Sequence, residues 1–69
     1  MTVSLEQLEA FVSSAEHGSF SAAGRALRKA QSAISTQVSN LETDLGVMLF
    51  DRAGRNPVLT PAGERLLRE

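Results

Sequence analysis

The chain has 69 residues, a formal net charge of −1 at pH 7, no cysteine and a single histidine, His17. This length supports one small domain of marginal stability. The composition excludes disulfides and thiolate chemistry, and one histidine leaves a structural zinc site too few of its usual ligands. Because the sequence has neither a long apolar run nor a signal-peptide pattern, we expect a cytoplasmic protein without a membrane span, metal or cofactor.

The charges are grouped along the chain. Acids alone occur in residues 1–24 and 42–51, bases alone occur in 25–41, and bases predominate in 52–68. The net charge argues against a polyanionic partner, since nucleic-acid binders usually carry a basic excess. The grouping leaves two interpretations open, because the basic blocks flank a neutral segment but also fit ordinary solvated patches.

A first helix is predicted to start at a capping box formed by Ser4 and Gln7. Gly18 is suited to end this helix in a left-handed cap. The apolar spacing predicts a buried side, which consists of Leu5, Leu8, Phe11 or Val12, and Ala15.

A second helix is predicted from a cap at Ser21 through Arg28, with Phe20 packing at its entrance. Its inward residues are expected to be Ala23, Ala26 and Leu27. Gly24 costs about 1 kcal/mol of helix propensity relative to alanine, but its small size lets another backbone approach closely.

A third helix is predicted to begin near Gln31 or Ser32 and to end at Gly46. An apolar stripe marks its buried side and consists of Ile34, Val38, Leu41 and Leu45. At about 100° per residue, the opposite side carries hydroxyls and amides. These residues are Ser32, Thr36, Ser39, Asn40 and Thr43, with Ser35 at the flank. Short neutral donors and acceptors beside a helix N-terminus are suited to the groove of a nucleic-acid duplex.

Two short apolar runs, Val47–Phe50 and Val58–Leu59, flank a turn at 53–57 and predict a small β-hairpin. Pro57 restricts this hairpin to edge pairing. Thr60 and Pro61 then cap and begin a fourth helix, whose apolar residues are Ala62, Leu66 and Leu67.

Helix, turn, helix and hairpin in this order predict a mainly α winged helix-turn-helix, with a three-helix core and a short β-hairpin wing. The second helix of such a motif enters the major groove of DNA. Arg52 and Arg55 lie on or beside the hairpin loop, where long cationic side chains reach phosphates or a minor groove.

An ordered set of short motifs extends this interpretation to a family. The set begins with Ala22-Ala23-x-x-x-Leu27, Gln31-Ser32-Ala33-Ile34-Ser35 and Val38-x-x-Leu41-Glu42-x-x-Leu45-Gly46. It continues with Leu49-Phe50-x-Arg52-x-x-Arg55 and Leu59-Thr60-x-Ala62-Gly63. With this spacing, essentially the whole chain resembles the N-terminal DNA-binding domain of LysR-type transcriptional regulators.

The resemblance implies a bacterial transcription regulator that binds double-stranded DNA in a sequence-specific way. A recognition helix at about 31–45 would lie in the major groove, and a wing at about 49–59 would reach the minor groove. By position, the family's contacts from the recognition helix match Gln31, Ser32, Ser35, Thr36 and Gln37. The wing contacts match Arg52 and Arg55, and a phosphate-contacting position matches Thr60.

The resemblance also implies a division of the chain. Residues 1–59 would form the DNA-binding domain, and 60–69 would begin a linker helix that pairs two subunits in the intact protein. An effector-binding domain that senses a small molecule would follow and is absent from this chain. We therefore expect a homo-oligomer for the intact protein and a monomer or weak dimer for this fragment.

Three features depart from the family pattern, and they involve four residues. Ala30 replaces a frequent serine or threonine, so the third helix lacks its usual N-cap unless Ser32 takes over that role. Thr36 and Asn40 lie where relatives often carry a basic side chain. Asp51 is adjacent to Arg52, and an ion pair between the two would make this arginine less available.

Other interpretations of these residues stay open. Gln37 lies about 60° from the apolar stripe and is also suited to covering the edge of the core. The Ser35 hydroxyl is able to bond back to the Gln31 carbonyl. A protein-interaction or dimerisation module with the same shell is a second function, which the negative net charge favours. An enzyme is the weakest option, because no nucleophile–base or metal constellation is apparent.

Overall fold

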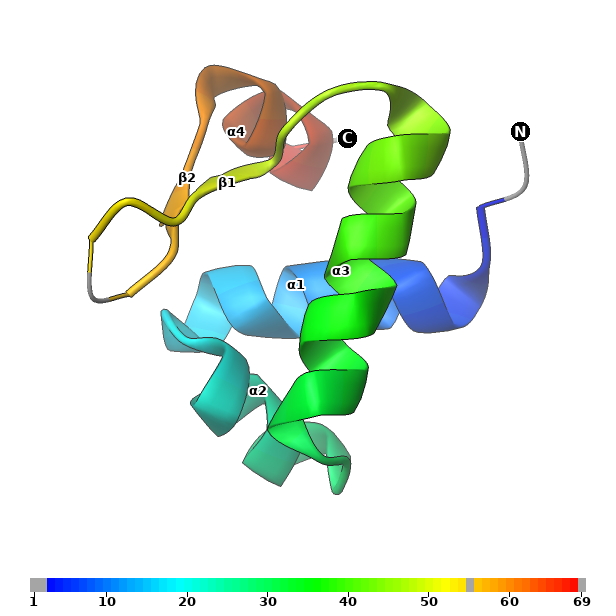
Figure 1. The fold of residues 1–69 in the computed structure, drawn as a ribbon, viewed down its shortest axis with the longest axis vertical. Helices are drawn as coiled ribbons and strands as arrows, with labels where there is room; N and C mark the ends of the chain where they lie inside the picture. Colours follow the sequence, from blue (N-terminus) through cyan, green and yellow to red (C-terminus); the bar gives the residue numbers. More distant parts are fainter. Residues whose placement is uncertain (1–2, 55, 69) are drawn as a thin grey trace.

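The computed structural model describes residues 3–54 and 56–68. Within these residues it contains four helices and one two-stranded antiparallel hairpin, which confirms a mainly α winged helix-turn-helix (Figure 1). No helix in these ranges is both long and apolar enough to cross a membrane. In chain order the elements are α1 (Leu5–His17), α2 (Phe20–Leu27), α3 (Gln31–Leu45), β1 (Phe50–Asp51), β2 (Val58–Leu59) and α4 (Pro61–Arg68).

Helix α1 begins and ends as its sequence predicts. The Ser4 hydroxyl accepts from the Gln7 backbone N–H at 3.2 Å, and the Gln7 side chain accepts from the Ser4 N–H at 2.9 Å. Gly18 ends the helix with a φ of 76°. Its predicted buried side is wrong for Leu5, which is 72% exposed. Of the two alternatives, Phe11 is buried and Val12 is 36% exposed. The buried side is rotated toward Gln7, Ala10, Phe11 and Ser14.

Helix α2 begins earlier than the sequence predicts. Ser19, rather than Ser21, is the N-cap, and its hydroxyl accepts from the Ala22 N–H at 3.0 Å. Phe20 is therefore the first helical residue, and it packs against the core. Of its predicted inward residues, Ala23 is fully buried as expected, whereas the prediction is wrong for Ala26, which is exposed.

Helix α3 has the predicted apolar stripe. Ile34, Val38 and Leu41 have no exposed surface, and Leu45 packs beside them. The helix starts at Gln31, and Gly46 ends it with a φ of 75°. This stripe makes α3 the centre of the domain, with α1 and α2 both packed on its buried side.

The wing is smaller than the two apolar runs predict. Its ladder pairs Phe50 with Leu59 and Asp51 with Val58, whereas Val47 and Met48 precede the strand and are 44% and 56% exposed. Only Leu49 and Phe50 of the first run reach the core, because the chain must turn away from the end of α3 before it can pair.

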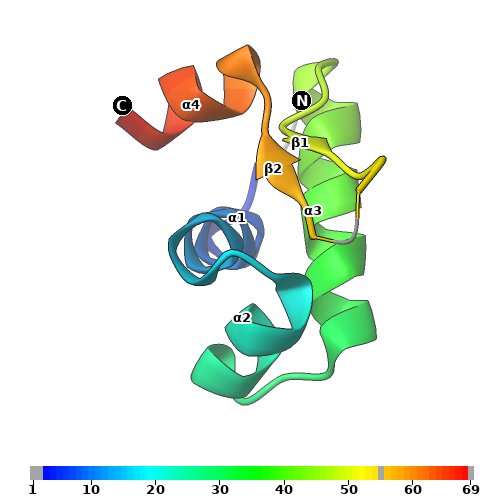
Figure 2. The same cartoon turned by 90° about the vertical axis from the view of Figure 1, so that its left-hand side faces the viewer.

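The core lies between α1, α3 and the base of the wing. The Phe50 ring is 5.6 Å from Phe11 in a tilted contact and 5.6 Å from Phe20 in an edge contact. Figures 1 and 2 together place α3 and the wing loop on the same side of the molecule, and α4 on the opposite side. This arrangement gives α3 an outward face beside the wing.

Candidate nucleic-acid interface

The outward face of α3 is exposed and uncharged. Gln31, Ser32 and Thr36 are exposed, and Ser35 and Gln37 are half-buried at its flanks. The same face continues toward the end of the helix through three further exposed residues, which are Ser39, Asn40 and Thr43. Helix α3 therefore brings the five predicted recognition residues together within its first two turns.

The N-terminus of α3 carries no side-chain cap. Ala30 occupies the N-cap position with extended backbone angles, φ −65° and ψ 147°, and Ser32 does not replace it. The Ala33 N–H donates to the Ala30 carbonyl at 3.0 Å, whereas the N–H groups of Gln31 and Ser32 have no hydrogen-bond partner among the described residues. The helix dipole adds positive potential at this end. An anion near Gln31 and Ser32 would therefore find unused donors.

Gly24 sets the distance between α2 and α3. A Cβ added at Gly24 would lie 2.6 Å from the carbonyl oxygen of Lys29 and 3.4 Å from the backbone nitrogen of Gln31. Arg28 turns the chain here in the left-handed region, with a φ of 58°. The tight turn of the motif thus depends on Gly24, because the absence of a side chain lets the backbone of the turn approach closely, as the sequence predicts.

Arg52 makes contacts that the sequence did not reveal. Its Nη2 lies 2.9 Å from the Oε1 of Glu42, and its guanidinium carbon lies 5.3 Å from the Phe20 ring centroid. The ion pair considered with Asp51 does not form in the structure, where Arg52 pairs with Glu42 and the Asp51 carboxylate accepts from the Ala53 backbone N–H at 2.9 Å. Arg52 is thus held at the base of the wing, with its side chain 33% exposed.

Arg55, the second predicted wing contact, lies outside the described residues. Its neighbours Gly54 and Asn56 are exposed. The wing loop on either side of this residue lies on the same side of the molecule as α3 (Figure 2).

Glu42 is the residue that sequence reasoning missed. It is 5% exposed, and its Oε2 accepts from the backbone N–H groups of Leu49 at 2.8 Å and Phe50 at 3.2 Å. A signal was present in the sequence, because Glu42 lies about 70° from the centre of the apolar stripe, at its edge. Carboxylates are rarely buried unless they are paired, so this position required partners.

Thr60 is engaged within the domain. Its hydroxyl donates to the Met48 carbonyl at 2.6 Å and accepts from the Gly63 N–H at 3.0 Å, which confirms its role as the cap of α4. The bond to Met48 ties the start of α4 to the segment that leads into β1, and the bond from Gly63 lies within the first turn of α4. The hydroxyl is therefore already used by the fold.

The first basic block lies on α2 and the turn after it. Arg25, Arg28 and Lys29 are exposed, and Lys29 pairs with Glu6 at 3.4 Å. An exposed ion pair of this kind contributes little to stability. It nevertheless shows that Glu6 partly neutralises this block.

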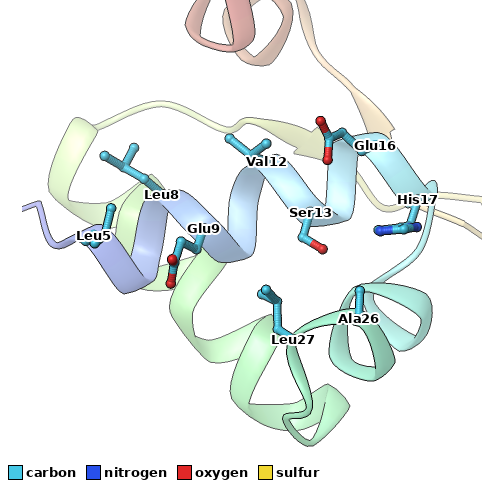
Figure 3. A pocket seen from close by; sticks show the side chains of 9 residues that line it. All are labelled: Leu5, Leu8, Glu9, Val12, Ser13, Glu16, His17, Ala26 and Leu27. Carbon is cyan, nitrogen blue, oxygen red and sulfur yellow. The ribbon is translucent and has the colours of Figure 1, made fainter.

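A second surface lies between α1 and α2. An open groove of about 460 Å³ lies in this place. Figure 3 shows the side chains that line it. Its apolar walls include Leu8, Val12 and Leu27, and two acids, Glu9 and Glu16, also line it. None of the described residues of α3 or of the wing lines this groove, so it is separate from the candidate interface.

The helix-turn-helix, the wing and the exposed neutral face define a winged helix-turn-helix domain. Residues 5–64 match the family model described as "Bacterial regulatory helix-turn-helix protein, lysR family". The chain therefore belongs to the LysR family.

Curated relatives agree with this assignment. The chain is 50% identical to the HTH-type transcriptional regulator AceR of Acinetobacter baumannii, in an alignment that covers 100% of this chain and 23% of AceR. It is 51% identical to an uncharacterized HTH-type transcriptional regulator of Azotobacter vinelandii, over 91% of this chain and 44% of that protein. The chain thus spans less than half the length of these relatives.

Solved structures show the same fold. The CbnR DBD in complex with DNA has a TM-score of 0.90 and 40% identity, over 94% of this chain and 75% of that one. Oxidized OxyR of Corynebacterium glutamicum has a TM-score of 0.92 and 41% identity, over 99% of this chain and 22% of that one.

Proposed function

We propose that this domain binds double-stranded DNA in a sequence-specific way, as the reading module of a LysR-type transcription regulator. The observation that carries the proposal is the exposed, uncharged face of α3 on the same side of the molecule as the wing loop. A recognition helix needs short polar side chains at base edges, and a wing needs cations near phosphates. The complex of the CbnR DBD with DNA, which shares this fold, supports the same conclusion.

The residues of α3 divide by their position on the helix. Gln31 and Ser32 lie at the uncapped N-terminus, where backbone N–H groups and the dipole favour a phosphate. Ser35, Thr36 and Gln37 lie one turn further along. We assign them to base edges, because amide and hydroxyl groups pair there and the threonine methyl is suited to the thymine methyl.

The wing supplies the phosphate or minor-groove contacts. Arg52 has five N–H donors, so its bond to Glu42 leaves others for DNA. Arg55 and Thr60 keep their proposed contacts on the resemblance alone. The Thr60 N–H donates to the Leu49 carbonyl at 3.0 Å, so a phosphate contact would require the hydroxyl to leave the Met48 carbonyl.

We propose that the intact protein is a homo-oligomer joined through a linker helix that starts at residue 60. Helix α4 supports this, because it packs on the domain through Leu66 while Leu67 is 39% exposed. Sedimentation of this fragment and of a longer chain tests the proposal. We expect a monomer or weak dimer for the fragment and a stable oligomer for the longer chain. Equal association constants would contradict the assignment.

Selection from a random pool of DNA duplexes tests DNA binding itself. We expect an enriched half-site, and binding to it that weakens with salt at a slope of about −0.9 per contacted phosphate. If no sequence is enriched and no duplex binds at low salt, while the chain forms a stable dimer or binds a protein partner, the alternative interaction module is correct.

A further inference from the structure

Glu42 connects α3 to the wing through three hydrogen bonds. One carboxylate oxygen accepts from the consecutive N–H groups of Leu49 and Phe50, and the other accepts from Arg52 at 2.9 Å. These donors lie before, at the start of and just after strand β1. The Glu42 side chain therefore anchors the path of the chain from α3 into the wing, together with the packing of Leu49 and Phe50 in the core.

The same connection extends to the start of α2. The Arg52 guanidinium covers the ring of Phe20 at 5.3 Å, within the range of a cation–π contact. Phe20 in turn meets Phe50 edge to face, with 89° between the ring planes. The ion pair thus closes a loop of contacts between α2, α3 and β1.

We propose that Glu42 is a positioning residue for DNA binding, which fixes the wing at the distance from α3 that lets both contact one duplex. This inference rests on the proposed function. A buried ion pair is weak evidence for stability, since desolvation offsets much of its attraction, and a unique arrangement is its better-supported benefit. Here the buried ion pair would fix the position of the wing relative to α3, the two elements proposed to contact DNA.

Both oxygens of the Glu42 carboxylate are needed as acceptors, because all three partner groups are donors. A glutamine at position 42 has the same shape, but its amide group is itself a donor and carries no charge. The NH₂ group of the glutamine amide would then face an N–H donor, and two donors cannot form a hydrogen bond with each other. The wing would lose either Arg52 or its backbone anchor, while the apolar core stays intact.

Glu42→Gln is the variant that tests this inference. Its matched control is Glu16→Gln, which makes the same charge change at an exposed position of α1. Binding is measured by fluorescence anisotropy on the duplex selected with the wild-type chain, over a range of salt. Circular dichroism and urea unfolding report whether each variant is folded.

For folded Glu42→Gln we expect a loss of affinity of about tenfold or more and a salt slope that is shallower by about 0.9 for each wing phosphate lost. A merely structural role would leave the slope unchanged in the folded protein. Glu16→Gln should match or slightly exceed wild type in affinity. Unchanged affinity and slope for folded Glu42→Gln overturn the inference, whereas failure of the wild-type chain to bind overturns the proposed function.

If Glu42→Gln does not unfold cooperatively, Glu42→Asp replaces it. This variant keeps the charge but shortens the side chain by one methylene, so it no longer reaches both backbone N–H groups and Arg52. A weaker affinity and a shallower slope than in the control Glu16→Asp support the inference. Equal values in the two variants contradict it.

Discussion

Gly24 faces the carbonyl oxygen of Lys29 across the turn between α2 and α3, and a Cβ at position 24 would lie 2.6 Å from that oxygen. Backbone atoms cannot yield as a flexible side chain does. The turn must therefore open before any larger residue fits. This contact fixes the start of α3 against α2.

Gly24→Ala is expected to lower the free energy of unfolding by about 1–3 kcal/mol, the usual cost of overpacking. Helix propensity alone predicts the opposite sign, a gain of about 1 kcal/mol. Urea unfolding distinguishes the two. Gly54→Ala is the control, because a Cβ there meets nothing within 4 Å, and it should change the free energy by less than about 0.5 kcal/mol.

Ala30→Ser should stabilise the domain by about 0.5–2 kcal/mol, because the N-cap of α3 has suitable backbone angles but no capping side chain. The control is Ala33→Ser, an exposed position inside the same helix, where serine costs about 0.5 kcal/mol of helix propensity. Both values come from urea unfolding. If Ala30→Ser lowers the free energy of unfolding as Ala33→Ser does, the missing N-cap does not weaken this helix.

Ser14→Ala should raise the free energy of unfolding by about 1–3 kcal/mol. The Ser14 hydroxyl is fully buried and has no hydrogen-bond partner among the described residues, so alanine removes an uncompensated polar group. The exposed Ser39→Ala measures the gain from helix propensity alone. Equal stabilisation by the two variants would mean that the buried hydroxyl is satisfied.

Thr36→Ala should change which sequences are selected more than it changes overall affinity. Thr36 is exposed on the outward face of α3, where its hydroxyl and methyl are suited to base edges rather than phosphates. Selection from the random pool with both proteins measures this. An unchanged profile would remove Thr36 from the residues that read bases.

Arg52→Gln is expected to weaken DNA binding, partly through Glu42. We predict about a tenfold loss for each single variant, Arg52→Gln and Glu42→Gln. The double variant should lose much less than the roughly hundredfold that independent effects would give. A loss of roughly hundredfold in the double variant would mean that Arg52 contributes to binding independently of Glu42.

The sequence predicted most of the fold because local patterns determine it. The capping box at Ser4, the stripe on α3, and the glycines that end α1 and α3 depend on residues within a few positions of one another. The errors arose where tertiary packing decided. Two serines near the start of α2 have the chemistry of an N-cap, and the packing of Phe20 accompanies the choice of Ser19.

The site was predictable in the same uneven way. Periodicity correctly places the outward face of α3, since the buried stripe fixes its opposite side. The bond between Arg52 and Glu42 joins residues from two elements, and nothing in the spacing distinguishes it from the adjacent Asp51. The rotated buried side of α1, which exposes Leu5 and Val12, likewise depends on how α1 crosses α3.

The most direct test of the central claim is an NMR titration of the isotope-labelled chain with the selected duplex. We predict that amide shifts concentrate on α3 from Gln31 to Asn40 and on the wing from Arg52 to Asn56. Residues that line the groove between α1 and α2, such as Val12 and Leu27, should change little. Shifts centred on that groove, with α3 and the wing unchanged, would contradict the account.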